Sequence, residues 1–189
     1  MKNSKKLYAW MSFGAALGVV AAFWQTLEKL TLIKNKDAVL QCNISKVFSC
    51  SNVLNSHQAS VFGFPNSIMC LILFVIFLSV ALVGLTGGAV SKKMRLSVQG
   101  LSLFTLGFAL WFLYQSTYNI GAICIFCVAC FTGLLIVNWA WLRLNVNDIS
   151  KNVNTRKKLN NMIKTGADLF IWIVIALVVV GAILFQFYI

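Results

Sequence analysis

Long uncharged hydrophobic runs dominate the pattern of this chain, where a soluble domain would show short amphipathic segments. Each run is close to the ~20 residues that an α-helix needs to cross the hydrocarbon layer of a membrane. The five runs cover about residues 7–24, 62–85, 96–114, 122–141 and 169–187. The pattern therefore predicts five transmembrane helices and an all-α integral membrane protein.

The composition supports this fold class. The chain has 189 residues, of which 60% are hydrophobic, 11% are charged and one is proline. Soluble domains carry about 25% charged residues. Five spans leave little chain for a soluble domain, so we expect the chemistry to lie within the membrane or just above it.

The net charge of +12 comes from basic residues clustered at the ends of the spans. If the spans alternate in direction, twelve basic residues share one side: Lys2, Lys5, Lys6, Lys92, Lys93, Arg95, Arg143, Lys151, Arg156, Lys157, Lys158 and Lys164. The other side has Lys29, Lys34, Lys36 and Lys46, diluted by Glu28 and Asp37. The positive-inside rule then predicts a cytoplasmic N-terminus. Clusters of this kind set topology and contact anionic lipid, and they do not indicate nucleic-acid binding.

A cleaved signal peptide is an alternative for the first run, because basic residues precede it. The run is longer than the ~7–15 apolar residues of a signal peptide, and Phe23-Trp24-Gln25 offers no small-residue cleavage site. We therefore expect a retained helix. The predicted outside segments are residues 25–61 and 115–121, and the predicted inside segments are residues 86–95 and 145–164.

Two cysteine pairs lie on the same predicted side. Cys124 and Cys127 form a C-x-x-C pair at the start of the fourth run, which in a helix places both thiols on one face and within disulfide reach. Cys42 and Cys50 lie in the first outside loop, on the oxidising side where disulfides persist. A helix N-terminus favours a thiolate. The pattern predicts a mobile pair that exchanges electrons with a fixed pair; two structural disulfides, or buried thiols, are the alternative.

The segment around Cys50 is expected to form a lid over the membrane surface. Residues 50–58 can form a short amphipathic helix with Val53 and Leu54 facing down. Gly63 and Pro65 predict a turn, after which Asn66 or Ser67 can cap the second span. Such a lid would bring Cys50 to Cys124 from above.

Three further residues have side chains of a reactive or metal-binding type. Cys130 extends the run to C-x-x-C-x-x-C, which resembles part of an iron–sulfur ligand set, but no fourth ligand is evident. We therefore interpret Cys130 and Cys70 as packing residues. His57, the only histidine, is interpreted as a surface residue, with deprotonation of a nearby thiol as the alternative. No metal site is predicted.

Electrons that leave Cys127 need an acceptor dissolved in the membrane, which indicates a quinone. A quinone site requires an apolar slot with a few polar groups for the carbonyls. Ser56 and Asn66 are the candidate polar groups. The slot would be lined by aromatic residues that could equally form an interfacial belt: Phe62, Phe64, Phe126 and Phe131.

In their order, these elements resemble the vitamin K epoxide reductase family. A loop pair is followed by Ser56, by Phe-Gly-Phe-Pro-Asn66-Ser67 at the start of a span, and by a later C-x-x-C pair. The bacterial DsbB type has the reverse order of pairs. The resemblance covers about residues 8–141.

The resemblance implies a four-helix transmembrane bundle around a quinone, capped by a periplasmic cysteine loop with a half-helix. The bundle would cover residues 1–144, followed by a basic cytoplasmic linker at 145–165 and a fifth transmembrane helix at 166–189. Cys42 would take electrons from a thioredoxin-like partner, Cys50 would pass them to Cys124, and Cys127 would face the quinone. Ser56 falls at the family's Ser/Thr position, and Asn66 matches the asparagine that binds quinone in animal members.

Two departures from the family refine the expected function. Phe131 stands where animal members have a tyrosine, which argues against epoxide reduction. No thioredoxin-like domain follows the fifth span, which indicates a separate DsbA-type partner. We expect an enzyme of the bacterial inner membrane that oxidises this partner and reduces ubiquinone or menaquinone. The alternatives are a non-enzymatic scaffold or transporter subunit with structural disulfides, and a reductase that consumes thiols.

Overall fold

A computed structural model describes residues 2–35, 38–45, 47–149 and 152–188 of the chain. Five of its helices are long and apolar enough to cross a membrane, as the sequence predicts. They are α1 (Lys2–Lys34), α3 (Asn66–Leu85), α4 (Lys92–Tyr114), α5 (Ile125–Asn145) and α7 (Ala167–Tyr188). The shorter elements are α2 (Cys50–Asn55), η1 (His57–Ser60), the π-helical turn η2 (Gln115–Ile120) and α6 (Val153–Thr165). The chain is therefore a helical, multi-pass membrane protein.

Two helices extend beyond the runs from which they were predicted. α1 continues ten residues past Trp24, because the segment up to Lys34 contains good helix formers and neither glycine nor proline. The expected outside loop therefore begins near Asn35, and Gln25 belongs to the helix. The predicted connection at 115–121 is mostly the π-helical continuation of α4, which ends at Gly121 in the left-handed conformation.

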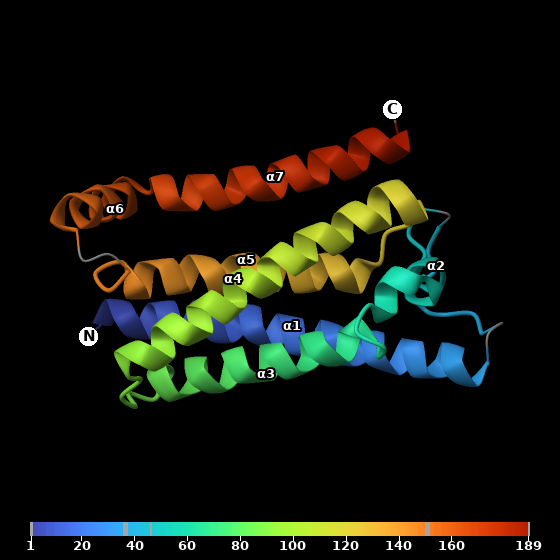
Figure 1. Ribbon diagram of the computed structural model, residues 1–189, viewed down its shortest axis with the longest axis horizontal. Coiled ribbons are helices and arrows are strands. Elements are labelled where there is room, and N and C mark those ends of the chain that lie inside the picture. Colours follow the sequence, from blue (N-terminus) through green and yellow to red (C-terminus); the bar gives the residue numbers. More distant parts are fainter. Residues whose placement is uncertain (1, 36–37, 46, 150–151, 189) are drawn as a thin grey trace.

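Four of the helices form the predicted bundle. α1 packs against both α3 and α5, and α4 runs obliquely across α5 (Figure 1). Small residues let α1 approach its neighbours closely, as is usual between membrane helices. A Cβ atom added to Gly133 would lie 2.6 Å from the Gly14 carbonyl oxygen, and one added to Gly18 would lie 2.1 Å from Phe74 Cε1. The core between the helices is therefore tightly packed.

The two ends of the bundle differ in character (Figure 1). The N-terminus, the turn between α3 and α4, and α6 lie at one end, which we call the basic end. The loop that carries α2, the turn η2 and the C-terminus lie at the other, which we call the cysteine end. The alternation of spans that the charge argument assumes is thus present. Four residues used in the charge argument lie outside the described residues: Lys36, Asp37, Lys46 and Lys151.

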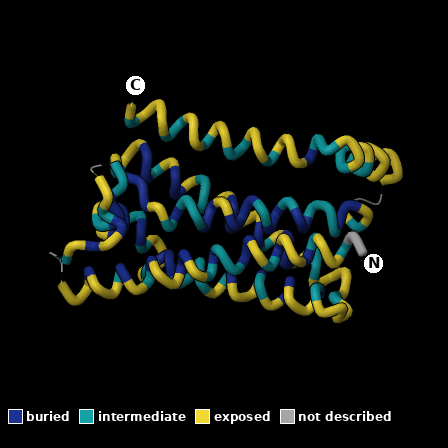
Figure 2. The backbone as a smooth tube through the Cα atoms, turned by 180° about the vertical axis from the view of Figure 1, so that it is seen from behind, coloured by how far each residue is buried: buried dark blue, intermediate teal, exposed yellow. Residues whose placement is uncertain are grey.

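α6 and α7 lie beside the bundle rather than within it. α6 covers most of the predicted linker at 145–165, so this segment is largely helical. α7 is exposed over most of its surface (Figure 2). The first turn of α7 is fixed to α5 by the buried Asp168. Its carboxylate accepts hydrogen bonds from Arg143 Nε at 2.6 Å and from Arg143 Nη2 at 2.9 Å. Asp168 is thus both an acidic residue in the first turn of α7 and the partner of Arg143. The domain boundaries at 144 and 165 stay a prediction.

Candidate functional site

The loop at the cysteine end folds around a short helix, α2, as the sequence predicts. Ser49 caps this helix by accepting a hydrogen bond from the Asn52 backbone, and the helix buries Cys50, Val53 and Leu54. Lys29 of α1 donates a hydrogen bond of 2.6 Å to the Leu54 carbonyl oxygen. The lid is thus held against α1 by its apolar face and by one cationic donor.

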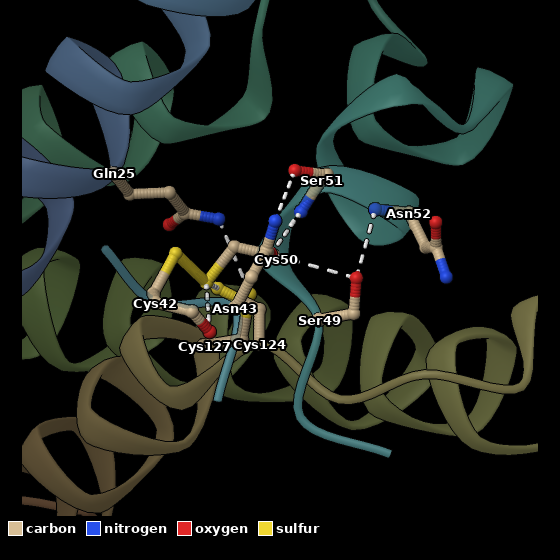
Figure 3. Close-up of a disulfide and its surroundings, with 9 residues drawn as sticks. All are labelled: Gln25, Cys42, Asn43, Ser49, Cys50, Ser51, Asn52, Cys124 and Cys127. Atoms are coloured by element: carbon tan, nitrogen blue, oxygen red, sulfur yellow. Dashed lines mark hydrogen bonds between the residues drawn. A yellow bond between two sulfur atoms is a disulfide. The ribbon is translucent and has the colours of Figure 1, made fainter. Parts of the chain in front are cut away.

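Cys50, the first residue of α2, forms a disulfide with Cys42 (Figure 3). Their Cα atoms are 5.7 Å apart, and both residues are almost completely buried. Asn43 holds the loop between them, because its side chain accepts from the Ser51 backbone at 3.1 Å and donates to the Ser51 hydroxyl at 2.7 Å. The loop pair is therefore ordered and covered in this state.

A short β-bridge joins this loop to the start of α5. Phe48 and Ile123 pair in parallel, and the Ile123 backbone donates a hydrogen bond of 2.7 Å to Val47. The segment before α5 is also held by η2, because the Ser116 hydroxyl donates to the Ala122 carbonyl oxygen at 2.5 Å. These contacts fix the segment before α5 in an extended conformation directly below α2.

Cys124 ends this extended segment. It has φ −94° and ψ 122° and stands at the N-cap of α5, so the prediction that both thiols of the C-x-x-C pair lie within a helix is wrong for Cys124. Its Sγ lies 3.3 Å from Cys50 Sγ (Figure 3). Cys124 and Cys127 are free thiols. The structure therefore brings all four predicted cysteines together and places the two pairs in sulfur–sulfur contact.

The surroundings of Cys124 favour its thiolate. The pKa of Cys124 is lowered, first by a hydrogen bond from the Cys127 thiol and then by the backbone N–H groups of Cys127 and Phe126 at the start of α5. Burial and the negative charge of Glu28 act in the opposite direction. Cys124 is therefore the more nucleophilic thiol of its pair.

Gln25 is a residue of the site that the sequence interpretation missed. Its side-chain Nε2 donates a hydrogen bond to Cys127 Sγ at 3.2 Å, and Gln25 is buried (Figure 3). The residue was assigned to the outside loop because the apolar run ends at Trp24. The helix-forming residues after Trp24 were the signal that could have identified Gln25. They extend α1 beyond the apolar run, so Gln25 and Glu28 face the core.

A small cavity of about 40 Å³ lies next to Cys127, below the contact between the two pairs. Its polar or sulfur-bearing lining residues are Gln25, Asn66, Ser67, Cys70, Cys127 and Cys130. Its apolar lining comes mainly from α4: Phe108, Ala109, Phe112 and Leu113, with Leu134 of α5. This cavity is the place in the bundle where a ligand could reach Cys127.

Of the four residues predicted to bind a cofactor, only Asn66 lines this cavity. The Ser56 hydroxyl donates to the Val53 carbonyl oxygen at the end of α2. Phe62 is half exposed and packs on Phe108 with ring centroids 5.8 Å apart. Phe131 is buried in the bundle but outside the lining. The predicted slot therefore differs from the cavity, because α4 supplies aromatic side chains whose orientation the sequence did not reveal.

Asn66 and Ser67 do not cap α3 as expected. Pro65 stands at the N-cap, and Asn66 is the first helical residue. The Asn66 side chain instead donates to the Gln58 carbonyl oxygen at 2.7 Å and accepts from the Val61 backbone at 3.3 Å. The turn at Gly63, with φ 81°, is present as predicted. Asn66 thus anchors the lid to the second span.

The remaining cysteines and His57 contribute no metal site among the residues that the structure describes. Cys130 is buried and its thiol faces the Gly18 carbonyl oxygen at 3.8 Å. Cys70 and Cys130 both line the cavity, so they are more than remote packing residues. His57 is exposed at the start of η1.

Comparison with known protein families agrees with this geometry. Residues 9–142 match the Vitamin K epoxide reductase family. A comparison with curated proteins finds no match. The family match spans the four bundle helices and all four paired cysteines, and it covers well over half of the chain. The chain therefore belongs to the vitamin K epoxide reductase family, a family of helical membrane thiol–disulfide oxidoreductases whose members use quinones.

Proposed function

We propose that this protein is a quinone-dependent enzyme that reoxidises a separate periplasmic thioredoxin-like protein of the DsbA type. Electrons would pass from Cys42 and Cys50 to Cys124 and Cys127, and then to ubiquinone or menaquinone. The observation that carries the proposal is the 3.3 Å contact between Cys50 Sγ and Cys124 Sγ, which links the two pairs. The product is disulfide bonds for secreted proteins.

The relay consists of thiol–disulfide exchanges that conserve electrons. A thiolate of the reduced partner attacks Cys42 and releases Cys50. The Cys50 thiolate attacks Cys124 of the oxidised inner pair and releases Cys127. The second partner thiol then displaces Cys42, which closes the Cys42–Cys50 disulfide by attack on Cys50 and leaves Cys124 and Cys127 as thiols. The oxidised outer pair and reduced inner pair of the structure match the end of this sequence.

The residues around Cys127 fit a quinone head group chemically. The cavity has mostly apolar walls, and the buried Ser67 hydroxyl that lines it has no hydrogen-bond partner among the described residues. A bound quinone supplies an acceptor for two electrons and two protons. The cavity of about 40 Å³ is far below the ~300 Å³ at which ligand pockets begin. Entry therefore requires side chains that line the cavity to move.

The charge distribution supports a cytoplasmic basic end and a periplasmic cysteine end. Exposed basic residues gather at the basic end, on α6 and at the start of α4. The positive-inside rule assigns such an end to the cytoplasm. The four paired cysteines then face the compartment in which disulfides persist.

Quinone-dependent thiol labelling tests the enzyme against a scaffold with structural disulfides. Protein in lipid nanodiscs is reduced, mixed with a short-chain ubiquinone, and labelled with maleimide. We expect Cys124 and Cys127 to lose labelling as quinone is added, and a reduced DsbA-type protein to restore it. Labelling that does not respond to quinone would contradict the proposal.

A second arm tests the role of Cys42 as the entry point. Cys42→Ala should block reduction by the DsbA-type protein, because the partner then lacks the sulfur that it attacks. A small dithiol should still reduce the Cys50–Cys124 disulfide of this variant. Equal loss with both reductants would argue against a shuttle role for Cys42.

A further inference from the structure

The Ser67 hydroxyl is a buried polar group that the relay does not use. Ser67 is the second residue of α3 and is 3% exposed. Its Oγ has no hydrogen-bond partner among the residues that the structure describes, and the residue lines the cavity beside Cys127. A buried hydroxyl without a partner carries a desolvation penalty, so such a group calls for an explanation. An oxygen atom of a ligand in the cavity would provide the missing partner.

The neighbouring Asn66 is already engaged in holding the lid. Its amide nitrogen donates to the Gln58 carbonyl oxygen, and its carbonyl oxygen accepts from the Val61 backbone. Both polar atoms of the side chain therefore bind residues of the lid loop. One residue later, the Ser67 hydroxyl is a buried side-chain donor without a partner among the described residues.

Gln25 supplies a second donor on the opposite helix. Its amide nitrogen binds Cys127 Sγ through one hydrogen and carries another. Gln25 on α1 and Ser67 on α3 both line the cavity, whose remaining walls are largely apolar. A carbonyl oxygen in this cavity would therefore lie among two donors and the thiol that has to be oxidised.

We propose that the Ser67 hydroxyl, together with the Gln25 amide, donates hydrogen bonds to one carbonyl oxygen of a quinone beside Cys127. This assignment rests on the proposed function, since it names the groups that position its acceptor. The Cys124 and Cys127 thiols give up two electrons and two protons and join as a disulfide. The same electrons and protons convert the quinone to hydroquinone, so the step balances. Donors at the oxygen favour the negative charge that builds there.

Infrared spectroscopy of bound quinone tests the hydrogen bond directly. A short-chain ubiquinone labelled with ¹³C at its carbonyls is added to the protein in nanodiscs, and the carbonyl stretch is recorded. A hydrogen bond lowers the frequency of this band. We expect a lowered band with wild type and with Ser67→Thr, which keeps the hydroxyl. With Ser67→Ala the band should move back toward that of free quinone.

The matched control is Ser12→Ala. Ser12 Oγ is also buried without a partner among the described residues, but Ser12 lies on α1 outside the lining of the cavity. Alanine is the best helix former, so neither alanine substitution disfavours its helix. The KM for quinone should rise about 3- to 10-fold in Ser67→Ala, as expected for the loss of one neutral hydrogen bond. Exchange with the DsbA-type protein should stay unchanged, and Ser12→Ala should match wild type in all three measurements.

The outcomes separate this proposal from the proposed function. An unchanged carbonyl band and unchanged KM in Ser67→Ala would overturn the role of Ser67 even if wild type reduces quinone. A lowered band in wild type that depends on Ser67, with no quinone reduction, would keep the binding assignment and overturn the proposed function. If wild type shows no lowered carbonyl band at all, the hydrogen bond does not form and the proposal fails.

Discussion

Cys50 Sγ lies 3.3 Å from Cys124 Sγ, although the two residues are 74 positions apart in the sequence. A disulfide bond is about 2.05 Å long, so a displacement of little more than 1 Å would join the two sulfurs. The bridge between Phe48 and Ile123 holds the lid and the start of α5 in this register. Exchange between the pairs therefore needs no large motion of the bundle, whereas access to the buried Cys42 from outside requires the lid to open.

Removal of Cys127 should stop the relay at a defined intermediate. In Cys127→Ala, the Cys124 thiolate can attack Cys50 and release Cys42, but it has no second thiol with which to form the inner disulfide. The released Cys42 thiolate can reverse this step, so the Cys50–Cys124 disulfide should accumulate above its level in wild type, and quinone reduction should fall to background. Mass spectrometry of non-reduced peptides and the absorbance of quinol measure the two effects.

Cys130→Ala provides the control for this experiment. Cys130 lies one turn further along α5 and lines the same cavity, but it does not take part in the contact between the pairs. This variant keeps both thiols of the inner pair, so it should not accumulate the Cys50–Cys124 disulfide. Normal turnover by Cys127→Ala would rule out its assignment as the residue that passes electrons to the quinone.

Gln25 should control the reactivity of Cys127. Its amide donates to Cys127 Sγ, and a neutral hydrogen bond contributes about 0.5–1.5 kcal/mol. In Gln25→Leu, we expect modification of Cys127 by an alkylating agent to slow by roughly 2- to 10-fold, because the sulfur loses the donor that supports it when it attacks the reagent. The rates are compared in a background with Cys70 and Cys130 replaced by alanine.

Thr26→Val is the matched control for Gln25. The Thr26 hydroxyl donates to the Ala22 carbonyl oxygen within α1, so this change alters the helix next to Gln25 without touching Cys127. Its rate of Cys127 modification should equal that of wild type. Equal rates in Gln25→Leu and Thr26→Val would show that the hydrogen bond has no influence on the thiol.

The features of the fold that depend on long apolar runs could be predicted from the sequence. Five spans, their alternation and the shared end of the two cysteine pairs follow from hydropathy and charge alone, because the bilayer permits few other arrangements. The short helix at Cys50 followed from the apolar spacing of Val53 and Leu54. Each of these predictions rests on a pattern within one segment of the chain.

The features that depend on contacts between segments could not be predicted. Nothing near Cys124 in the sequence shows that the β-bridge of Ile123 holds it in an extended conformation at the helix N-cap. The end of hydrophobicity at Trp24 was taken as the end of a helix, which hid Gln25. Phe62 and Phe131 were assigned to a slot on residue type alone, whereas the aromatic side chains that line the cavity beside Cys127 are Phe108 and Phe112 of α4.

Gly133 should be required for the close approach of α1 and α5. An added Cβ atom would lie 2.6 Å from the Gly14 carbonyl oxygen, a backbone atom that cannot move without shifting α1. Gly133→Ala should destabilise the protein by about 1–3 kcal/mol, the range found when a packed core is overfilled. Unfolding in mixed micelles with increasing denaturing detergent measures this loss.

Gly107→Ala is the control for the helix-forming effect of alanine. Gly107 lies within α4, and an added Cβ atom there meets nothing within 4 Å. Because alanine favours a helix more than glycine does, this variant should be as stable as wild type or slightly more stable. A Gly133→Ala protein that also gains stability would show that the two helices are not in contact at this point.

Asp148 at the basic end should make the stability depend on pH. The pKa of Asp148 is lowered by the hydrogen bond and charge of Lys92, with a further contribution from Arg95, both on α4. A carboxyl group with a lowered pKa in the folded state contributes stability above its unfolded pKa of about 3.9 and loses it as the pH falls through the folded value. Between pH 6 and pH 2.5, wild type should therefore lose more unfolding free energy than Asp148→Asn, which has no charge to lose.

Added salt should shrink the difference, since Lys92 is mostly exposed. Asn147→Ala, a neutral change at the adjacent position, should keep the pH dependence of wild type. If the unfolding free energy of Asp148→Asn depends on pH as strongly as that of wild type, the ion pairs do not couple α4 to the end of α5.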